Sequence, residues 1–413
     1  MEILDSPMAA NLSVTEVVQA YFSAFAQGDI ERAVGLLDDD VVWHIDGSSH
    51  VSTVGILQGK AQVRCWLESF LSNFKPREFV ISELIDHHEN VVALGRFRHT
   101  VLSTGNTVGS DMVVHFKVAN SRIARYQIFE DSALLGRAFD PADRWQQQQL
   151  KINHTLYRYW ERGEGPTLIF AHGLFVNHEV FTAQVNALSE SYRCIVFDMP
   201  GHGQSGYHPD GWTLDDLCRD IALMILELSL APVTFIGQSQ GGMVGIRLAA
   251  RYPGLVSGLV LIGTSARAEF PERLDHWQRQ REIIINGAEQ QREAVFSAIQ
   301  HHINGATWLL NNPGEVLHER GVMLAHDRAG LVLALDAAVF TRGDVQELLP
   351  LVKVPTLVIC GEHDTATPVE LSREIAEAIE NASLAILTNV GHHPTIEAPT
   401  EVTEAISEFL CNV

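Results

Sequence analysis

The sequence predicts two domains of different classes, an α+β domain followed by an α/β domain. The chain has 413 residues, which is more than one hydrophobic core usually organises. The first third shows helical periodicity and then alternation of apolar and polar residues, whereas the remainder alternates short apolar runs with amphipathic helical segments. We therefore expect domains at residues 13–140 and 151–413, joined by a linker at 141–150.

The first domain begins with helices and continues as a sheet. Ser13 and Glu16 form a capping-box pattern, and the helical spacing that follows is interrupted at Gly28-Asp29. A second short helix, a strand containing VVWHIDG and a helix over KAQVRCWLESFLSNF come next. Long alternating segments with polar turns between them complete the domain. This order predicts helices packed on a curved antiparallel sheet.

The second domain opens with a strand hairpin, QLKINHTLYRYWER, and continues with buried strands. Apolar runs such as PTLIFAHG, YRCIVFDMP and PTLVICGEHD each end in small or polar residues. Runs of this kind separated by helices are typical of a mostly parallel sheet covered on both faces. Residues from about 266 to 348 show only helical patterns between two strands, so we expect a helical cap over the carboxyl edge of the sheet, where such sheets bind ligands.

Composition and charge exclude several classes of function. The net charge of −22 argues against binding to nucleic acid, which requires clustered basic residues. Five cysteines without a C-x-x-C pair predict reduced thiols. The N-terminus lacks the pattern of a secretory signal, and no apolar run is long enough for a membrane span, so we expect a cytoplasmic protein. The paired histidines lack metal-ligand spacing, and we expect neither a metal nor a cofactor.

The segment FIGQSQGGM carries the strongest chemical signal. A strand runs into Gly237-Gln238-Ser239-Gln240-Gly241, and a helix follows. Glycines two residues before and after a serine allow a sharp turn that presents the hydroxyl at the edge of the sheet, beside a helix N-terminus. Ser239 is therefore the candidate nucleophile.

A serine nucleophile needs a base and an orienting carboxylate, and the later strands supply both. Asp364 follows one strand, and either His392 or His393 follows the last. The order Ser, Asp, His is the one expected in this architecture. The backbone N–H groups of Leu174 and Gln240 could form an oxyanion hole.

Residues 148–413 resemble the α/β-hydrolase family through five stretches in family order. These are HG at 172–173, DMPGHGQS at 198–205, GQSQG at 237–241, GEHD at 361–364 and GHHPTIEAP at 391–399. The family pattern Gly-His-x-Pro-x-x-Glu-x-Pro selects His392 as the base. The resemblance therefore implies a triad of Ser239, His392 and Asp364, and the stretch from Ile359 is most similar to the enol-lactonase and small-ester hydrolase branch.

The implied reaction is acyl transfer to Ser239 and then to water, on a small or medium carboxylic ester or lactone. We expect His172, Gly173, Trp277 and Trp308 to line the substrate pocket. Hydrolysis of carbon–carbon bonds uses the same triad and stays open. A non-catalytic receptor for a small molecule on a hydrolase scaffold also stays open.

The first domain resembles the SnoaL-like family, which includes ketosteroid isomerase and polyketide cyclases. The resemblance is carried by YFSAFAQGDIERAVGLLDDDVVWHIDG, GKAQVRCWLESF and RIARYQIFEDSALL. It implies a cone-shaped domain that binds a ligand or pairs two copies of the chain, or a second active site that makes the protein bifunctional. Trp43, Asp46 and His115 are the expected cavity residues, although Trp43 and Asp46 lie on opposite faces of one strand.

Overall fold

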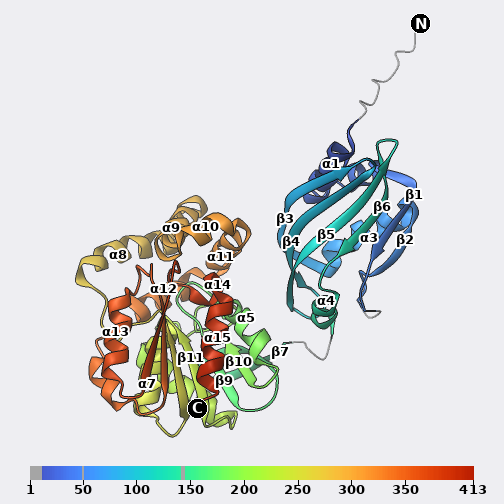
Figure 1. Cartoon of the computed structure of the whole chain (residues 1–413). Coiled ribbons are helices and arrows are strands. Elements are labelled where there is room, and N and C mark those ends of the chain that lie inside the picture. Colours follow the sequence, from blue (N-terminus) through green and yellow to red (C-terminus); the bar gives the residue numbers. More distant parts are fainter. Residues whose placement is uncertain (1–11, 49–50, 141–144) are drawn as a thin grey trace. The chain divides into compact units, whose positions relative to one another are not determined.

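The computed structural model describes residues 12–48, 51–140 and 145–413 (Figure 1). The contacts within the chain form two compact units, Met1–Trp145 and Gln146–Val413. The first is an α+β domain, and the second is an α/β domain with a mostly parallel sheet and an inserted helical cap. The predicted fold class is confirmed.

The N-terminal domain wraps helices around a six-stranded sheet of order β2-β1-β6-β5-β4-β3. Neighbouring strands are antiparallel except β1 and β6, which pair in parallel, so the expected antiparallel sheet contains one parallel pair. The predicted capping box is present, because Ser13 Oγ accepts from the backbone N–H of Glu16. The elements are α1 (Val14–Ala26), α2 (Ile30–Gly35), β1 (Leu37–Ile45), β2 (Gly55–Gln58), α3 (Gly59–Asn73), β3 (Phe74–His87), β4 (Asn90–Val101), β5 (Thr107–Ala119), β6 (Arg122–Phe129) and α4 (Ser132–Phe139).

The C-terminal domain has an eight-stranded sheet of order β14-β13-β12-β11-β9-β10-β8-β7. The hairpin β7 and β8 joins the sheet antiparallel to β10, and the other pairings are parallel. The elements outside the cap are β7 (Gln146–Ile152), β8 (Thr155–Arg162), β9 (Thr167–Ala171), η2 (His178–Phe181), α5 (Thr182–Leu188), β10 (Arg193–Phe197), α6 (Leu214–Glu227), β11 (Val233–Gln238), α7 (Gln240–Arg251), β12 (Val256–Ile262), β13 (Thr356–Gly361), α13 (Val369–Ala378), β14 (Ala382–Leu387), α14 (Pro394–Glu397) and α15 (Pro399–Leu410).

The range expected for the linker, 141–150, overlaps the first strand of the C-terminal domain. Strand β7 begins at Gln146 because the glutamine run pairs residue by residue with β8. Residues 141–144, the centre of the expected linker, lie outside the described residues.

The cap separates β12 from β13 and gathers at one end of the sheet (Figure 1). Hydrogen bonds run from Thr365 Oγ1 to His302 O and from the backbone N–H of His392 to Ile303 O. The end of α9 therefore lies against the loops that follow β13 and β14. The elements are α8 (Pro271–Asn286), α9 (Glu289–Ile303), α10 (Ala306–Asn311), α11 (Pro313–Ala325), α12 (Arg328–Leu335), η3 (Asp336–Phe340) and η4 (Gln346–Leu351).

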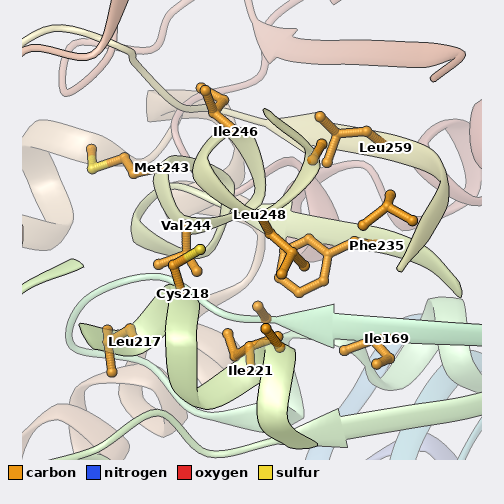
Figure 2. Close-up of a cluster of buried hydrophobic side chains, with 14 of the residues drawn as sticks. Ile169, Leu217, Cys218, Ile221, Phe235, Met243, Val244, Ile246, Leu248 and Leu259 are labelled. Atoms are coloured by element: carbon orange, nitrogen blue, oxygen red, sulfur yellow. The ribbon is translucent and has the colours of Figure 1, made fainter. Parts of the chain in front are cut away.

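Helices α6 and α7 pack against the sheet and bury its apolar side chains (Figure 2). Ile169, Phe235 and Leu259 come from three neighbouring strands and are fully buried against Ile221 and Leu248. Burying each such side chain contributes about 1.5–3 kcal/mol to the free energy of unfolding. This packing fixes the position of α7, which the GQSQG segment joins to the end of β11. Within the described ranges, none of the helices is both long and apolar enough to span a bilayer.

Candidate active site

Ser239 lies at the sharp turn between β11 and α7. Its backbone has φ 50° and ψ −114°, a conformation that L-residues rarely adopt. A Cβ atom on Gly237 would lie 2.4 Å from the carbonyl carbon of Gly241, and one on Gly241 would lie 2.0 Å from Ala171 O. Glycine is required at both positions because the backbone segments pass this closely. The turn presents the hydroxyl of Ser239 at the carboxyl end of β11.

A continuous hydrogen-bond chain joins the three expected triad residues. Ser239 Oγ lies 3.0 Å from His392 Nε2, and His392 Nδ1 lies 2.8 Å from Asp364 Oδ2. Asp364 and His392 are 4% and 6% exposed. A carboxylate accepts only, so His392 donates from Nδ1 and keeps Nε2 free to accept from the serine hydroxyl. This is the tautomer that a general base for Ser239 requires.

The carboxylate of Asp364 is held by its own loop. Its Oδ1 accepts from the backbone N–H groups of Ala366 and Thr367 at 2.9 and 2.8 Å. Its Oδ2 accepts from Thr367 Oγ1 at 2.8 Å. Burial alone would raise the pKa of Asp364, but His392 and these donors outweigh it and hold the pKa below its ordinary value. The carboxylate is therefore ionised, and Thr367 is a site residue that the sequence analysis missed.

The loop after β9 borders the serine on its other side. A Cβ atom on Gly173 would lie 3.0 Å from Ser239 Cβ, so the absence of a side chain there relieves crowding beside Ser239. Gln240 is the first residue of α7, where backbone N–H groups have no partner within the helix. Across the described segments, neither Leu174 nor Gln240 donates its backbone N–H to a backbone carbonyl outside a helix or strand. Both amides are therefore candidates for an oxyanion hole.

The other expected pocket residues differ in their placement. His172 is completely buried, its Nδ1 is bonded to Gly173 O and its Nε2 accepts from the backbone N–H of Met199. Its expected contact with substrate is therefore wrong, because both ring nitrogens support the backbone. Trp277 packs with Phe175 in the apolar cluster of the cap, at 6.3 Å between ring centroids. Trp308 is buried on α10.

The N-terminal domain encloses a cavity with an empty volume of about 620 Å³, its open mouth included. Aromatic side chains such as Phe70 and Phe97 form most of the lining, and Trp43 stacks on Tyr126 at 4.3 Å between ring centroids. Trp43 therefore lies where we expected it.

The other two expected cavity residues lie outside the lining. Asp46 is exposed and pairs with His44 at 2.9 Å, and His115 Nε2 bonds to Asn90 Oδ1. Side chains alternate along a strand, so β1 cannot turn both Trp43 and Asp46 inward.

Glu130 is the cavity residue that the sequence analysis missed. It directly follows β6 and lines the cavity beside Tyr126 and Ile128. Burial raises the pKa of Glu130 to about 7. The inward positions of β6 predict this placement, since 126, 128 and 130 share one face. His99 also lines the cavity, and burial lowers its pKa to about 4.

No group of three or more residues suited to hold a metal ion occurs in the part of the chain that the structure describes.

Comparisons with known proteins agree with both domains. Residues 166–399 match the family described as the alpha/beta hydrolase fold, and residues 18–126 match the SnoaL-like domain. A putative carbamate hydrolase, RutD, from Serratia proteamaculans is 28% identical over 228 residues, which are 55% of this chain and 84% of that protein.

Solved structures extend the same similarity. An enol-lactonase from Burkholderia xenovorans has a TM-score of 0.59 and 28% identity, covering 64% of this chain and 100% of its own. A thermophilic esterase from Thermogutta terrifontis has a TM-score of 0.59 and 27% identity, covering 65% of this chain and 98% of its own. The chain belongs to the α/β-hydrolase family and carries a SnoaL-like domain before its hydrolase domain.

Proposed function

We propose that the C-terminal domain is a serine hydrolase that acts on small or medium carboxylic esters or lactones. The observation that carries the proposal is the unbroken hydrogen-bond chain from Ser239 through His392 to Asp364. Each neighbouring pair in this chain is within hydrogen-bond distance, and the carboxylate at its end is buried and ionised. That arrangement activates a hydroxyl for attack on a carbonyl carbon.

The proposed mechanism follows from these contacts. His392 Nε2 takes the hydroxyl proton as Ser239 Oγ attacks the carbonyl carbon, and Asp364 stabilises the imidazolium that forms. The backbone N–H groups of Leu174 and Gln240 stabilise the oxyanion. His392 then protonates the departing alkoxide and leaves an acyl-enzyme. Water, deprotonated by His392, releases the acid and restores Ser239.

The choice of an ester or lactone is supported by the relatives and by the cap. The named relatives include an enol-lactonase, an esterase and a putative carbamate hydrolase, whose names all denote hydrolysis at a carbonyl group. The cap's apolar cluster includes Phe175 and packs against Leu174, one of the two proposed oxyanion-hole residues. An apolar acyl group fits beside such a surface better than a charged one.

A substrate panel tests the reaction. Wild type should hydrolyse p-nitrophenyl esters of C2 to C12 acids or simple lactones, and Ser239→Ala should lower kcat/KM by at least about 10⁴-fold, because the nucleophile is gone. Ser407→Ala is the matched control, since its hydroxyl donates to Thr403 O on the terminal helix α15. Turnover that survives Ser239→Ala would contradict the triad, and binding without turnover would favour the receptor alternative.

We propose that the N-terminal domain binds an apolar small molecule. The aromatic cavity favours this role over pairing of two chains, because a domain that only dimerises has no need of a hollow interior. Action in the cytoplasm is part of the proposal, since all five cysteines are free thiols, as in a reducing compartment.

A further inference from the structure

A buried ion pair connects the cap to the loop of the catalytic base. His393 follows His392 in the loop after β14, and its Nδ1 lies 2.6 Å from Oε1 of Glu319 on the cap helix α11. The two side chains are 2% and 5% exposed. Separating a pair this well shielded from water leaves an uncompensated buried charge, so the two residues hold each other in place.

Glu319 also binds the end of a second cap helix. Its Oε2 accepts from Gln300 Nε2 at 2.6 Å and from Asn304 Nδ2 at 2.9 Å. Both donors lie at the C-terminal end of α9. The carboxylate therefore accepts from three side chains, one on the catalytic loop and two on the cap, and all three fix its position.

The same end of α9 holds the backbone of His392 and of Gly391 before it. The backbone N–H of His392 donates to Ile303 O at 2.7 Å. Oε2 of Glu397 accepts from Gly391 and from Gly305 of the cap, each at 2.8 Å. A Cβ atom on Gly391 would lie 2.4 Å from Ile303 O, which shows how closely the loop and the cap approach. A shift of α9 would therefore move the backbone of His392.

The charges around His393 are complementary. Burial alone would lower the pKa of His393, but the carboxylates of Glu319, Glu397 and Asp364 outweigh it and raise the pKa above its ordinary value. Burial would raise the pKa of Glu319, whereas His393 and the amide donors lower it. Both shifts favour the charged forms of the pair. The ring of His393 lies 5.4 Å from that of His392 between centroids.

We propose that Glu319 and His393 are positioning residues, which hold His392 in line between Ser239 and Asp364 from the side of the cap. This inference rests on the proposed serine hydrolase. If Glu319 and His393 act in this way, the cap helps to set the position of His392 in the triad. A pair that only stabilised the fold would change the unfolding temperature without changing the reactivity of Ser239.

The test is the rate of Ser239 labelling by a fluorophosphonate in full-length Glu319→Gln. We expect labelling to slow about 10- to 100-fold, the effect of small misplacements of a catalytic group. Asp336→Asn is the control, because Asp336 pairs with Arg281 inside the cap at 2.7 Å and does not reach the loop. It should label within about twofold of wild type. The proposal would be overturned if Glu319→Gln were labelled at the wild-type rate although the pKa of His393 was lowered in this variant.

Wild type supplies a test that needs no variant. Its labelling rate should fall as the pH rises through the deprotonation of His393, which imidazole ¹⁵N NMR follows. A rate that stays level through that titration would contradict the proposal. If wild type is not labelled at all, the hydrolase proposal fails instead. NMR then still decides on positioning, because the Nδ1–H signal of His392 should shift in Glu319→Gln and not in Asp336→Asn.

Discussion

At the scale of single residues, the environment of one carboxyl group determines what the N-terminal cavity can hold. Glu130 lies among aromatic side chains, and its pKa of about 7 means that its charge changes near neutral pH. A neutral apolar ligand would have to bury this group further, and burial of a carboxylate costs more than burial of the neutral acid.

We therefore expect binding of a neutral fluorophore, N-phenyl-1-naphthylamine, to weaken about tenfold between pH 6 and pH 8 as Glu130 ionises. Glu130→Gln should remove this dependence, because the amide stays neutral. Glu83→Gln changes an exposed position on β3 and should behave as wild type. Fluorescence titration measures all three proteins. Equal pH dependence in wild type and Glu130→Gln would contradict the account of the cavity.

At the scale of elements, the sequence predicted the features that depend on residues close together in the chain. The capping box of α1, the hairpin of β7 and β8 and the turn from β11 to α7 all depend on neighbouring residues, and all three form as expected. The parallel pairing of β1 with β6 was not predictable in this way. It joins segments about 80 residues apart, and neither strand's own alternation specifies its neighbour.

The residues of the candidate site show the same difference between what local sequence predicts and what only the fold brings together. Ser239, Asp364 and His392 each follow a strand, so the family pattern was enough to place them together. The contributions of Glu319 and His393 could not be predicted, because α11 and the last loop meet only in three dimensions. His172 misled the sequence analysis because its position beside Gly173 suggests substrate contact, whereas burial assigns both ring nitrogens to the backbone.

At the scale of the whole molecule, buried histidines set the response of the hydrolase domain to acid. His172, His202 and His326 each accept a backbone N–H on one ring nitrogen. Protonation would place an N–H against each of these donors. Burial lowers the pKa of all three groups, to about 4 for His172. The unfolded chain binds these protons from about pH 6.5 downward, whereas burial keeps the histidines of the folded chain neutral to a lower pH. The stability that the three neutral histidines contribute is therefore fully present above pH 6.5 and is lost as the pH falls.

We expect the free energy of unfolding of the C-terminal domain to fall by on the order of 3 kcal/mol between pH 6.5 and pH 4 through the protonation of His172 alone. Urea unfolding at several pH values measures this loss. His326→Gln should flatten the dependence, because its amide can accept from Gly203 and donate to Phe175 without titrating. His154→Gln alters an exposed histidine and serves as the control. A stability that stays constant from pH 7 to pH 5 would contradict this assignment.

The central claim is that Ser239 is an activated nucleophile, and the most direct measurement is the site of covalent labelling. Wild type is treated with a fluorophosphonate, and the adduct is located by peptide mass spectrometry. The account predicts one adduct per chain, on Ser239, and none in Ser239→Ala, because His392 and Asp364 activate that hydroxyl alone. An unlabelled Ser239, or an adduct on another residue that persists in Ser239→Ala, would contradict it.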